Sequence, residues 1–295
     1  MANPQRSPSR PIATFSLVAR DPETNDLGVV VASKFLAVGA VVPTAVAGVG
    51  AVATQSYANV SYGPRALAIL ERGGSPDDCL QEFEASDDNF QERQFGIVSA
   101  TGASVTFTGS ECHAWAGGIA GENFAAQGNI LTGPDVVDAL VAGVQRTDLP
   151  FPERLLEALA AADERGGDKR GRQSASLLVV GEGKGYGGLN DRWIDLRVDD
   201  HEDPVSELRR LLTLNRLYMD KPSEEPRQLS TWDIEWLQGL LAKEGYLVRK
   251  PTGEWDDETE QALAALFGVE NLEERWVGGP AVDPVAWQYL EEKFG

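Results

Sequence analysis

Hydrophobic residues come in short runs separated by polar turns along the first part of the chain, which is the pattern of buried strands. Two apolar stretches, 14–20 and 27–33, are joined by the polar turn Asp21-Pro22-Glu23-Thr24-Asn25-Asp26 and predict a pair of strands. Glycine-punctuated apolar stretches continue to about residue 60. Further strands are predicted at 94–108, as two strands around Thr101-Gly102, at 174–180 and at 192–198.

Apolar residues at helical spacing mark the segments between these strands. Residues 62–71 form one such segment, and Ser75 followed by Pro76 is a typical N-cap and first turn for the next. Further helices are expected at 135–145, 151–162 and 207–218. Strands, then paired helices, then strands again favour a layered α+β architecture over a doubly wound one.

The last quarter of the chain has a pattern of its own. Residues 219–228 have the composition of a linker, and two apolar stripes follow at helical spacing: Ile234, Leu237, Leu240 and Leu241, then Leu263, Leu266 and Phe267. We therefore expect a disordered tail at 1–13, a main domain at 14–218, a linker at 219–228 and a small, mainly helical domain at 229–295.

Composition narrows the classes of function. The net charge of −20 argues against a nucleic-acid partner, because there is no excess of cations to displace counterions from phosphates. No run approaches the roughly 18 apolar residues that span a bilayer, and residues 1–10 lack the apolar core of a signal peptide. We therefore expect a cytoplasmic protein with no membrane partner.

The sequence predicts neither a metal site nor a cofactor; a carboxylate site for magnesium or calcium stays open, but no EF-hand spacing is present. Two cysteines and two histidines exclude a disulfide framework and a multi-histidine zinc site. Residues 183–188 match GxGxxG, but the residues that follow alternate like a strand instead of opening a helix. This segment is predicted to be a glycine-rich hairpin. Cys112 and His113 are not expected to form a thiol dyad, since neighbours on a strand point to opposite faces.

Several short motifs together carry a family resemblance. They are Thr14-Phe15-Ser16, Val31-Ala32-Ser33-Lys34, Thr54-Gln55-Ser56-Tyr57-Ala58-Asn59, Gln127-Gly128-Asn129-Ile130-Leu131 and the run from Gly166 to Ser174. With them, residues 14 to about 217 resemble the bacterial domain-of-unknown-function 1028 family, which is placed in the Ntn-hydrolase superfamily. The resemblance implies a four-layer αββα Ntn-hydrolase sandwich.

The C-terminal segment carries a second resemblance. Leu237-Gln238, Gly245-Tyr246, Gly253-Glu254-Trp255-Asp256 and Ala262-Leu263 make residues 229 to about 290 similar to a peptidoglycan-binding-type helical domain. This resemblance implies a cell-wall fragment as a partner of the C-terminal domain.

The first resemblance places a catalytic nucleophile at Thr14. In an Ntn hydrolase the α-amine of the first residue takes the proton of its own side-chain hydroxyl, so removal of residues 1–13 is required. Ser16 lies on the same face two residues on and is the second candidate. Lys34 is the charged neighbour and stands where threonine-type members have an aspartate. The alternatives are that Thr14 simply starts a strand and that Lys34 is solvated.

Other polar residues are candidates for substrate binding. Gln55, Ser56 and Asn59 follow an apolar strand, and Asn129 is interpreted as lying in a glycine-flanked turn. Amide side chains suit oxyanion stabilisation or binding of a substrate amide, and turn capping is the alternative.

The run before the strand at 174–180 is a further candidate for substrate binding. Asp168 and Arg172 are expected to form an ion pair, Arg172 is a candidate clamp for a carboxylate, and Ser174 is expected to line the site. A solvated loop is the alternative for this segment.

The resulting hypothesis is an Ntn-type amidohydrolase that acts on a small amide or peptide through a hydroxyl nucleophile. The alternative is a non-catalytic ligand-binding or assembly protein on the same scaffold. A homo-oligomer is expected, because αββα sandwiches often stack.

Overall fold

The computed structural model describes residues 14–295, and the expected tail at 1–13 lies outside the described residues. The chain divides into two compact units, one ending at Leu211 and the other spanning Leu212–Gly295. The division falls within helix α5 (Pro204–Met219). Within the described part of the chain, no helix combines the length and apolar character needed to cross a membrane.

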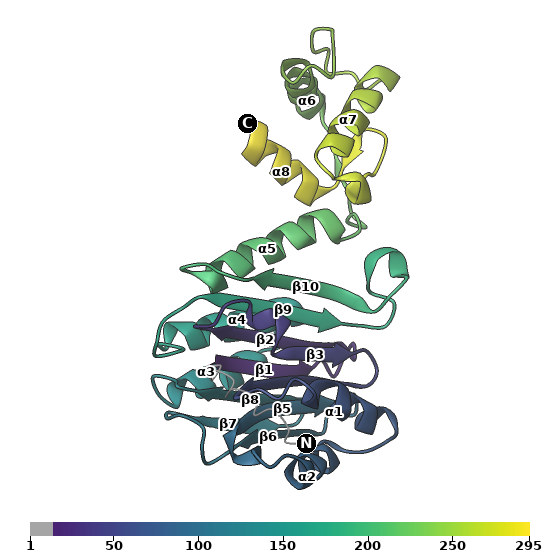
Figure 1. Ribbon diagram of the computed structural model, residues 1–295. Helices are drawn as coiled ribbons and strands as arrows, with labels where there is room; N and C mark the ends of the chain where they lie inside the picture. Colours follow the sequence, from purple (N-terminus) through teal and green to yellow (C-terminus); the bar gives the residue numbers. More distant parts are fainter. Residues whose placement is uncertain (1–13) are drawn as a thin grey trace, which may run out of the picture. The chain divides into compact units, whose positions relative to one another are not determined.

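Two antiparallel sheets form the centre of the first unit (Figure 1). The six-stranded sheet has the order β10-β9-β2-β1-β8-β7, with β1 (Thr14–Arg20), β2 (Leu27–Ser33), β7 (Gly117–Gly121), β8 (Phe124–Asn129), β9 (Ser174–Val180) and β10 (Arg192–Val198). The four-stranded sheet has the order β3-β4-β5-β6, with β3 (Pro43–Val46), β4 (Gly50–Ser56), β5 (Arg93–Ser99) and β6 (Ser104–Thr108).

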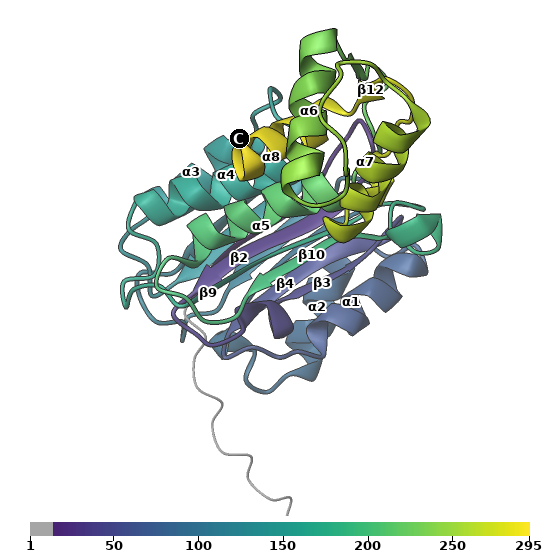
Figure 2. The ribbon, with the colours of Figure 1, turned by 90° about the horizontal axis from the view of Figure 1, so that it is seen from above.

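Helices cover the outer face of each sheet, which makes four layers (Figure 2). Helices α1 (Tyr62–Glu71) and α2 (Pro76–Ser86) lie on the four-stranded sheet, and α3 (Asp135–Val144) and α4 (Phe151–Glu164) lie on the six-stranded sheet. Between the sheets, alternate residues of both pack together, among them Val18, Val29, Val31, Ala51, Ala53 and Val98. The four-layer α+β sandwich is therefore confirmed as the fold class.

Most of the predicted elements are present at the expected positions. The helix at 62–71 and the strands at 174–180 and 192–198 have the predicted bounds. Ser75 caps α2 by accepting a hydrogen bond from the amide of Asp78, and Cys79 is fully buried. The 183–188 segment joins antiparallel β9 and β10, as predicted for a hairpin.

Two interpretations of polar segments were wrong. Asn129 does not lie in a turn but ends β8, where it pairs with Thr14. Strand β4 runs through Ser56, so Gln55 lies inside a strand and not after it. The β7–β8 hairpin escapes prediction because its glycine- and alanine-rich strands have low β-propensity.

The second unit is mainly helical, with α6 (Thr231–Lys243), α7 (Asp257–Val269), α8 (Pro284–Phe294) and the short pair β11 (Arg227–Gln228) and β12 (Ala281–Val282). Its core includes Leu237, Leu241, Leu263, Phe267, Trp287 and Leu290. The buried Arg275 guanidinium pairs with Asp283 at 2.9 Å and donates a hydrogen bond to the carbonyl of Leu217.

Candidate active site

A row of polar side chains crosses one end of the six-stranded sheet. Thr14 starts β1 and pairs with Ser33 on β2 and with Asn129 on β8, and Ser33 pairs with Ser174 on β9. Directly paired residues project from the same face of a sheet. All four side chains are buried, with at most 2% of any residue exposed. The Thr14 hydroxyl donates a hydrogen bond to Ser33 Oγ at 3.2 Å.

Two glutamines of the four-stranded sheet reach across to this row. Gln55 Nε2 donates to the backbone carbonyl of Thr14 at 3.2 Å, and Ser16 Oγ donates to Gln55 Oε1 at 2.6 Å. Asn129 Nδ2 donates to Gln94 Oε1 at 2.8 Å. The buried polar layer, as we call it, comprises Thr14, Ser16, Ser33, Gln55, Gln94, Gln127 and Asn129, all uncharged and all buried.

Backbone carbonyls fix the orientation of the amides in the buried polar layer. Gln94 Nε2 donates to the carbonyl of Gly128 at 2.7 Å and to that of Gly117 at 3.3 Å. A carbonyl only accepts hydrogen bonds, so the amide nitrogen of Gln94 must face these groups and its oxygen must face the opposite way. That oxygen therefore accepts from both Asn129 and Gln55.

The hydrogen bonds keep a fixed direction from Gln55 through Ser16 to Gln127 as well. Gln55 uses its oxygen to accept from Ser16, and Ser16 Oγ in turn accepts from Gln127 Nε2 at 2.7 Å. A Cβ at Gly96 would lie 2.1 Å from Gln127 Oε1, so glycine at this position makes room for the amide. The Ser16 proton is held by an amide oxygen and the Thr14 proton by the Ser33 hydroxyl, so neither hydroxyl has a strong base as its hydrogen-bond acceptor.

One acceptor in the buried polar layer has no partner. Asn129 Oδ1 is buried and forms no hydrogen bond with any of the described residues. Leaving a buried acceptor without a partner costs about 1–3 kcal/mol. Most buried polar groups are paired, so an exception at the residue opposite Thr14 calls for a functional explanation.

The loop after β2 holds the other predicted residues on this side of the site. The Lys34 amide donates to Asp168 Oδ2 at 2.8 Å, while the exposed Lys34 side chain donates to the carbonyl of Arg172 at 3.0 Å. Ser174 Oγ accepts from the amide of Val38 at 3.1 Å and donates to the carbonyl of Phe35. These contacts tie the loop after β2 to the start of β9.

The expected ion pair between Asp168 and Arg172 was wrong. Asp168 pairs with Arg170 at 2.9 Å, and Arg172 pairs with Asp163 on α4 at 2.8 Å. The reason is that Asp168 turns inward, with 5% of its surface exposed, and accepts from the amides of Lys34 and Arg170.

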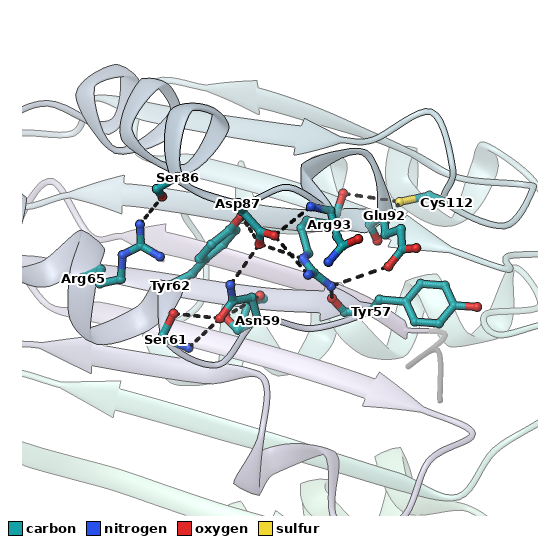
Figure 3. Close-up of polar contacts among 12 residues, drawn as sticks. Tyr57, Asn59, Ser61, Tyr62, Arg65, Ser86, Asp87, Glu92, Arg93 and Cys112 are labelled. Carbon is teal, nitrogen blue, oxygen red and sulfur yellow. Dashed lines mark hydrogen bonds and ion pairs between the residues drawn. The ribbon is translucent and has the colours of Figure 1, made fainter. Parts of the chain in front are cut away.

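Asn59 belongs to a different, charged cluster (Figure 3). Its Nδ2 donates to Asp87 Oδ2 at 2.9 Å, and the same carboxylate accepts from the Tyr62 hydroxyl at 2.8 Å and pairs with Arg93 at 2.9 Å. Burial by itself raises the pKa of Asp87, but the hydrogen bonds from Arg93, Asn59, the Asn89 amide and Tyr62 outweigh it, so the pKa lies far below its usual range. We call these residues the Asp87–Arg93 cluster.

Cys112 and His113 contact different partners. Cys112 Sγ lies 3.4 Å from the carbonyl of Arg93, and burial raises the pKa of its thiol. His113 Nε2 lies 3.4 Å from the hydroxyl of Tyr57. Both residues lie in the loop between β6 and β7, so the prediction that they are neighbours on a strand was wrong, although their side chains do contact different groups.

A family model described as "Family of unknown function (DUF1028)" matches residues 14–208, so the match begins at Thr14 itself. The chain belongs to the DUF1028 family. A crystal structure of a DUF1028 protein from Silicibacter pomeroyi is similar, with 30% sequence identity and a TM-score of 0.62. The match covers 69% of this chain and 89% of that one. No curated protein matches the chain. Residues 218–290 match the model of a peptidoglycan binding domain.

Within the DUF1028 domain, three residues of the buried polar layer were not predicted from the sequence: Ser33, Gln94 and Gln127. A signal for the two glutamines was present, because each is a long polar residue in an otherwise apolar or small-residue strand. Of the predicted residues, Thr14, Ser16, Gln55 and Asn129 come together in this layer. Asn59, Lys34, Asp168 and Arg172 lie in the loops and the charged cluster described above.

Proposed function

We propose that the DUF1028 domain is an amide hydrolase of the N-terminal-nucleophile type, with Thr14 as its nucleophile once residues 1–13 are removed. The observation that carries the proposal is the position of Thr14. It is the first residue of a central strand, its hydroxyl bonds to Ser33 within an uncharged buried layer, and the family match begins there.

The chemistry follows from the groups at this end of β1. An α-amino group has an ordinary pKa of about 8, and burial favours its neutral form. The neutral amine takes the proton of the Thr14 hydroxyl, and Oγ1 attacks the carbonyl carbon of a small amide or peptide. The amine then protonates the leaving nitrogen, which departs and leaves an acyl ester on Thr14. Water hydrolyses this ester and regenerates the hydroxyl.

An intact mass spectrum combined with assays of amide hydrolysis tests the proposal. A mass that corresponds to a chain beginning at Thr14 is expected, together with release of amine from a panel of N-acyl amino acids and aryl amides. Thr14→Val keeps the shape of the side chain and should abolish the activity, whereas Thr14→Ser should retain part of it. Thr101→Val, at an exposed turn, is the matched control.

Full retention of residues 1–13, with any activity unaffected by Thr14→Val, would contradict the assignment of Thr14. A non-catalytic ligand-binding or assembly role is the second candidate. It is favoured by the complete burial of Thr14 and by the lack of charge among the residues of the buried polar layer. Light scattering tests the homo-oligomer expected for such a scaffold, and the cytoplasmic location likewise stays a prediction.

For the second unit we propose binding of a cell-wall fragment, supported by the match of residues 218–290 to a peptidoglycan binding domain. Sedimentation of the full chain with isolated peptidoglycan tests this. The chain is expected to sediment with the peptidoglycan and to return to the supernatant when soluble muropeptides are added. A chain that does not sediment with the peptidoglycan would count against the proposal.

A further inference from the structure

The orientation of the Asn129 side chain leaves its oxygen available to a donor. Asn129 Nδ2 donates to Gln94 Oε1 at 2.8 Å, and Gln94 cannot turn over because its own nitrogen is held by the carbonyls of Gly128 and Gly117. The amide of Asn129 is therefore fixed with its oxygen directed away from Gln94. That oxygen is buried and has no partner among residues 14–295.

Thr14 is the residue best placed to supply a donor. It lies directly opposite Asn129 in the β1–β8 ladder, and directly opposed residues have Cβ atoms about 5 Å apart. Within an uncleaved chain the nitrogen of Thr14 is a peptide nitrogen with one N–H. Cleavage before Thr14 converts this nitrogen into an amine with additional N–H donors, which appear beside the open acceptor.

We infer that Asn129 is a positioning residue whose Oδ1 accepts a hydrogen bond from the α-amine of Thr14 in the cleaved chain. The Thr14 hydroxyl already donates to Ser33 Oγ, so hydroxyl and amine are held by different neighbours. A hydrogen bond from one N–H to Asn129 fixes the rotation of the amine and leaves the nitrogen lone pair free to face Oγ1. The inference rests on the proposed function, since it requires a free amine at Thr14.

The charged groups near this amine come from several elements. Lys34 follows β2, and Asp168, Arg170 and Arg172 precede β9. The Asp87–Arg93 cluster and His113 lie where β5 begins and β6 ends. Most of these groups are paired with one another, as described above. An amine held by Asn129 is therefore expected to respond most strongly to a charge placed at Asn129 itself.

Labelling of the α-amine by an acylating reagent, followed across pH by mass spectrometry of the N-terminal peptide, tests the inference. The full protein is used with Thr14 as its first residue. A specific protease site placed directly before Thr14 generates this end where it does not form spontaneously. Asn129→Asp puts a negative charge next to the amine, favours the ammonium form and is expected to slow labelling at pH 7 about tenfold.

Asn129→Ala removes the acceptor and is expected to shift the labelling profile the opposite way, to lower pH. It leaves Gln94 Oε1 with its second donor, Gln55, so the fold is kept even where the aspartate variant does not fold. Asn123→Asp makes the same change in the turn before β8, where the side chain bonds to Arg20, and serves as the matched control. A labelling profile that neither Asn129 variant moves overturns the inference.

Labelling requires no turnover, so the two proposals fail separately. A protein that hydrolyses no amide but shows the opposite shifts in the two variants supports the role of Asn129 and removes the proposed reaction. A protein that hydrolyses amides with an unmoved labelling profile keeps the reaction and removes the role of Asn129.

Discussion

The Asp87–Arg93 cluster and the buried polar layer around Thr14 differ in how their polar groups are compensated. Both place polar side chains in the interior of the first unit. In the cluster, a part-buried carboxylate contacts a guanidinium, a hydroxyl and an amide, so its charge is well compensated. In the layer, every group is neutral and one acceptor is open. A saturated cluster is suited to holding elements together, whereas an open acceptor is suited to receiving another group.

Removal of one partner of the charged pair is expected to have the largest effect. Arg93→Leu leaves the part-buried Asp87 carboxylate without its counter-ion and also removes the hydrogen bond to the Tyr57 carbonyl. The free energy of unfolding should fall by about 3 kcal/mol, as measured by urea denaturation. Arg146→Leu, which breaks an exposed ion pair with Asp148, is the control and should leave stability unchanged. Equal effects of the two variants would show that the cluster is not structural.

A smaller loss is expected from the centre of the neutral layer. Gln94→Met keeps the length of the side chain but leaves the Gly128 carbonyl and the Asn129 amide without their partner. We expect about 2 kcal/mol of destabilisation in the same denaturation experiment. Gln91→Met is the matched change at an exposed position and should cost little. A neutral outcome for Gln94→Met would mean that the layer reorganises freely, which contradicts the fixed orientation of its amides.

The two regions should also differ in their response to acid. The pKa of Asp87 is lowered in the folded state, so its stabilising contribution is present above the unfolded pKa of about 4 and is lost as the pH falls further. Protonation keeps the side chain in place, so we expect a smaller effect than from Arg93→Leu. Thermal unfolding between pH 6 and pH 2 measures it, and Asp87→Asn should flatten this part of the profile. Gln94→Met should lower the profile without changing its slope.

The smallest effect on stability is expected at Lys34. Its side chain is exposed and donates to one backbone carbonyl, so Lys34→Met should change the free energy of unfolding by less than about 0.5 kcal/mol. The hydrolysis assay then separates the two interpretations of this residue. A loss of activity of a hundredfold or more, with stability intact, would assign Lys34 to the chemistry. Unchanged activity would show that Lys34 is a solvated residue of the loop after β2 with no role in the chemistry.

Sequence patterns predicted the parts of the fold that depend on local interactions. Alternation along β1 placed Thr14 and Ser16 on one face, and the capping residues around Ser75 marked the start of α2. Strand β8 was missed because its two alanines and one glycine carry little β-propensity, yet it lies next to β1 in the sheet.

The site was predicted less completely, for a related reason. Gln94 contacts Asn129, and Gln127 contacts Ser16, only through pairings between strands far apart in the sequence. No local pattern encodes which strand faces which. Asp168 was assigned Arg172 as its partner because the sequence does not show that its carboxylate turns inward to the amide of Lys34, where Arg170 pairs with it.

The fixed order of hydrogen bonds in the buried polar layer also determines where protons can travel. Amide groups donate and accept hydrogen bonds but do not exchange protons readily at neutral pH, so Gln55, Gln94 and Gln127 form no relay for protons. The layer is polar but does not conduct protons. A proton that leaves the Thr14 hydroxyl has to pass to a group in direct contact with it, and acid–base chemistry at this end of β1 is confined to its immediate surroundings.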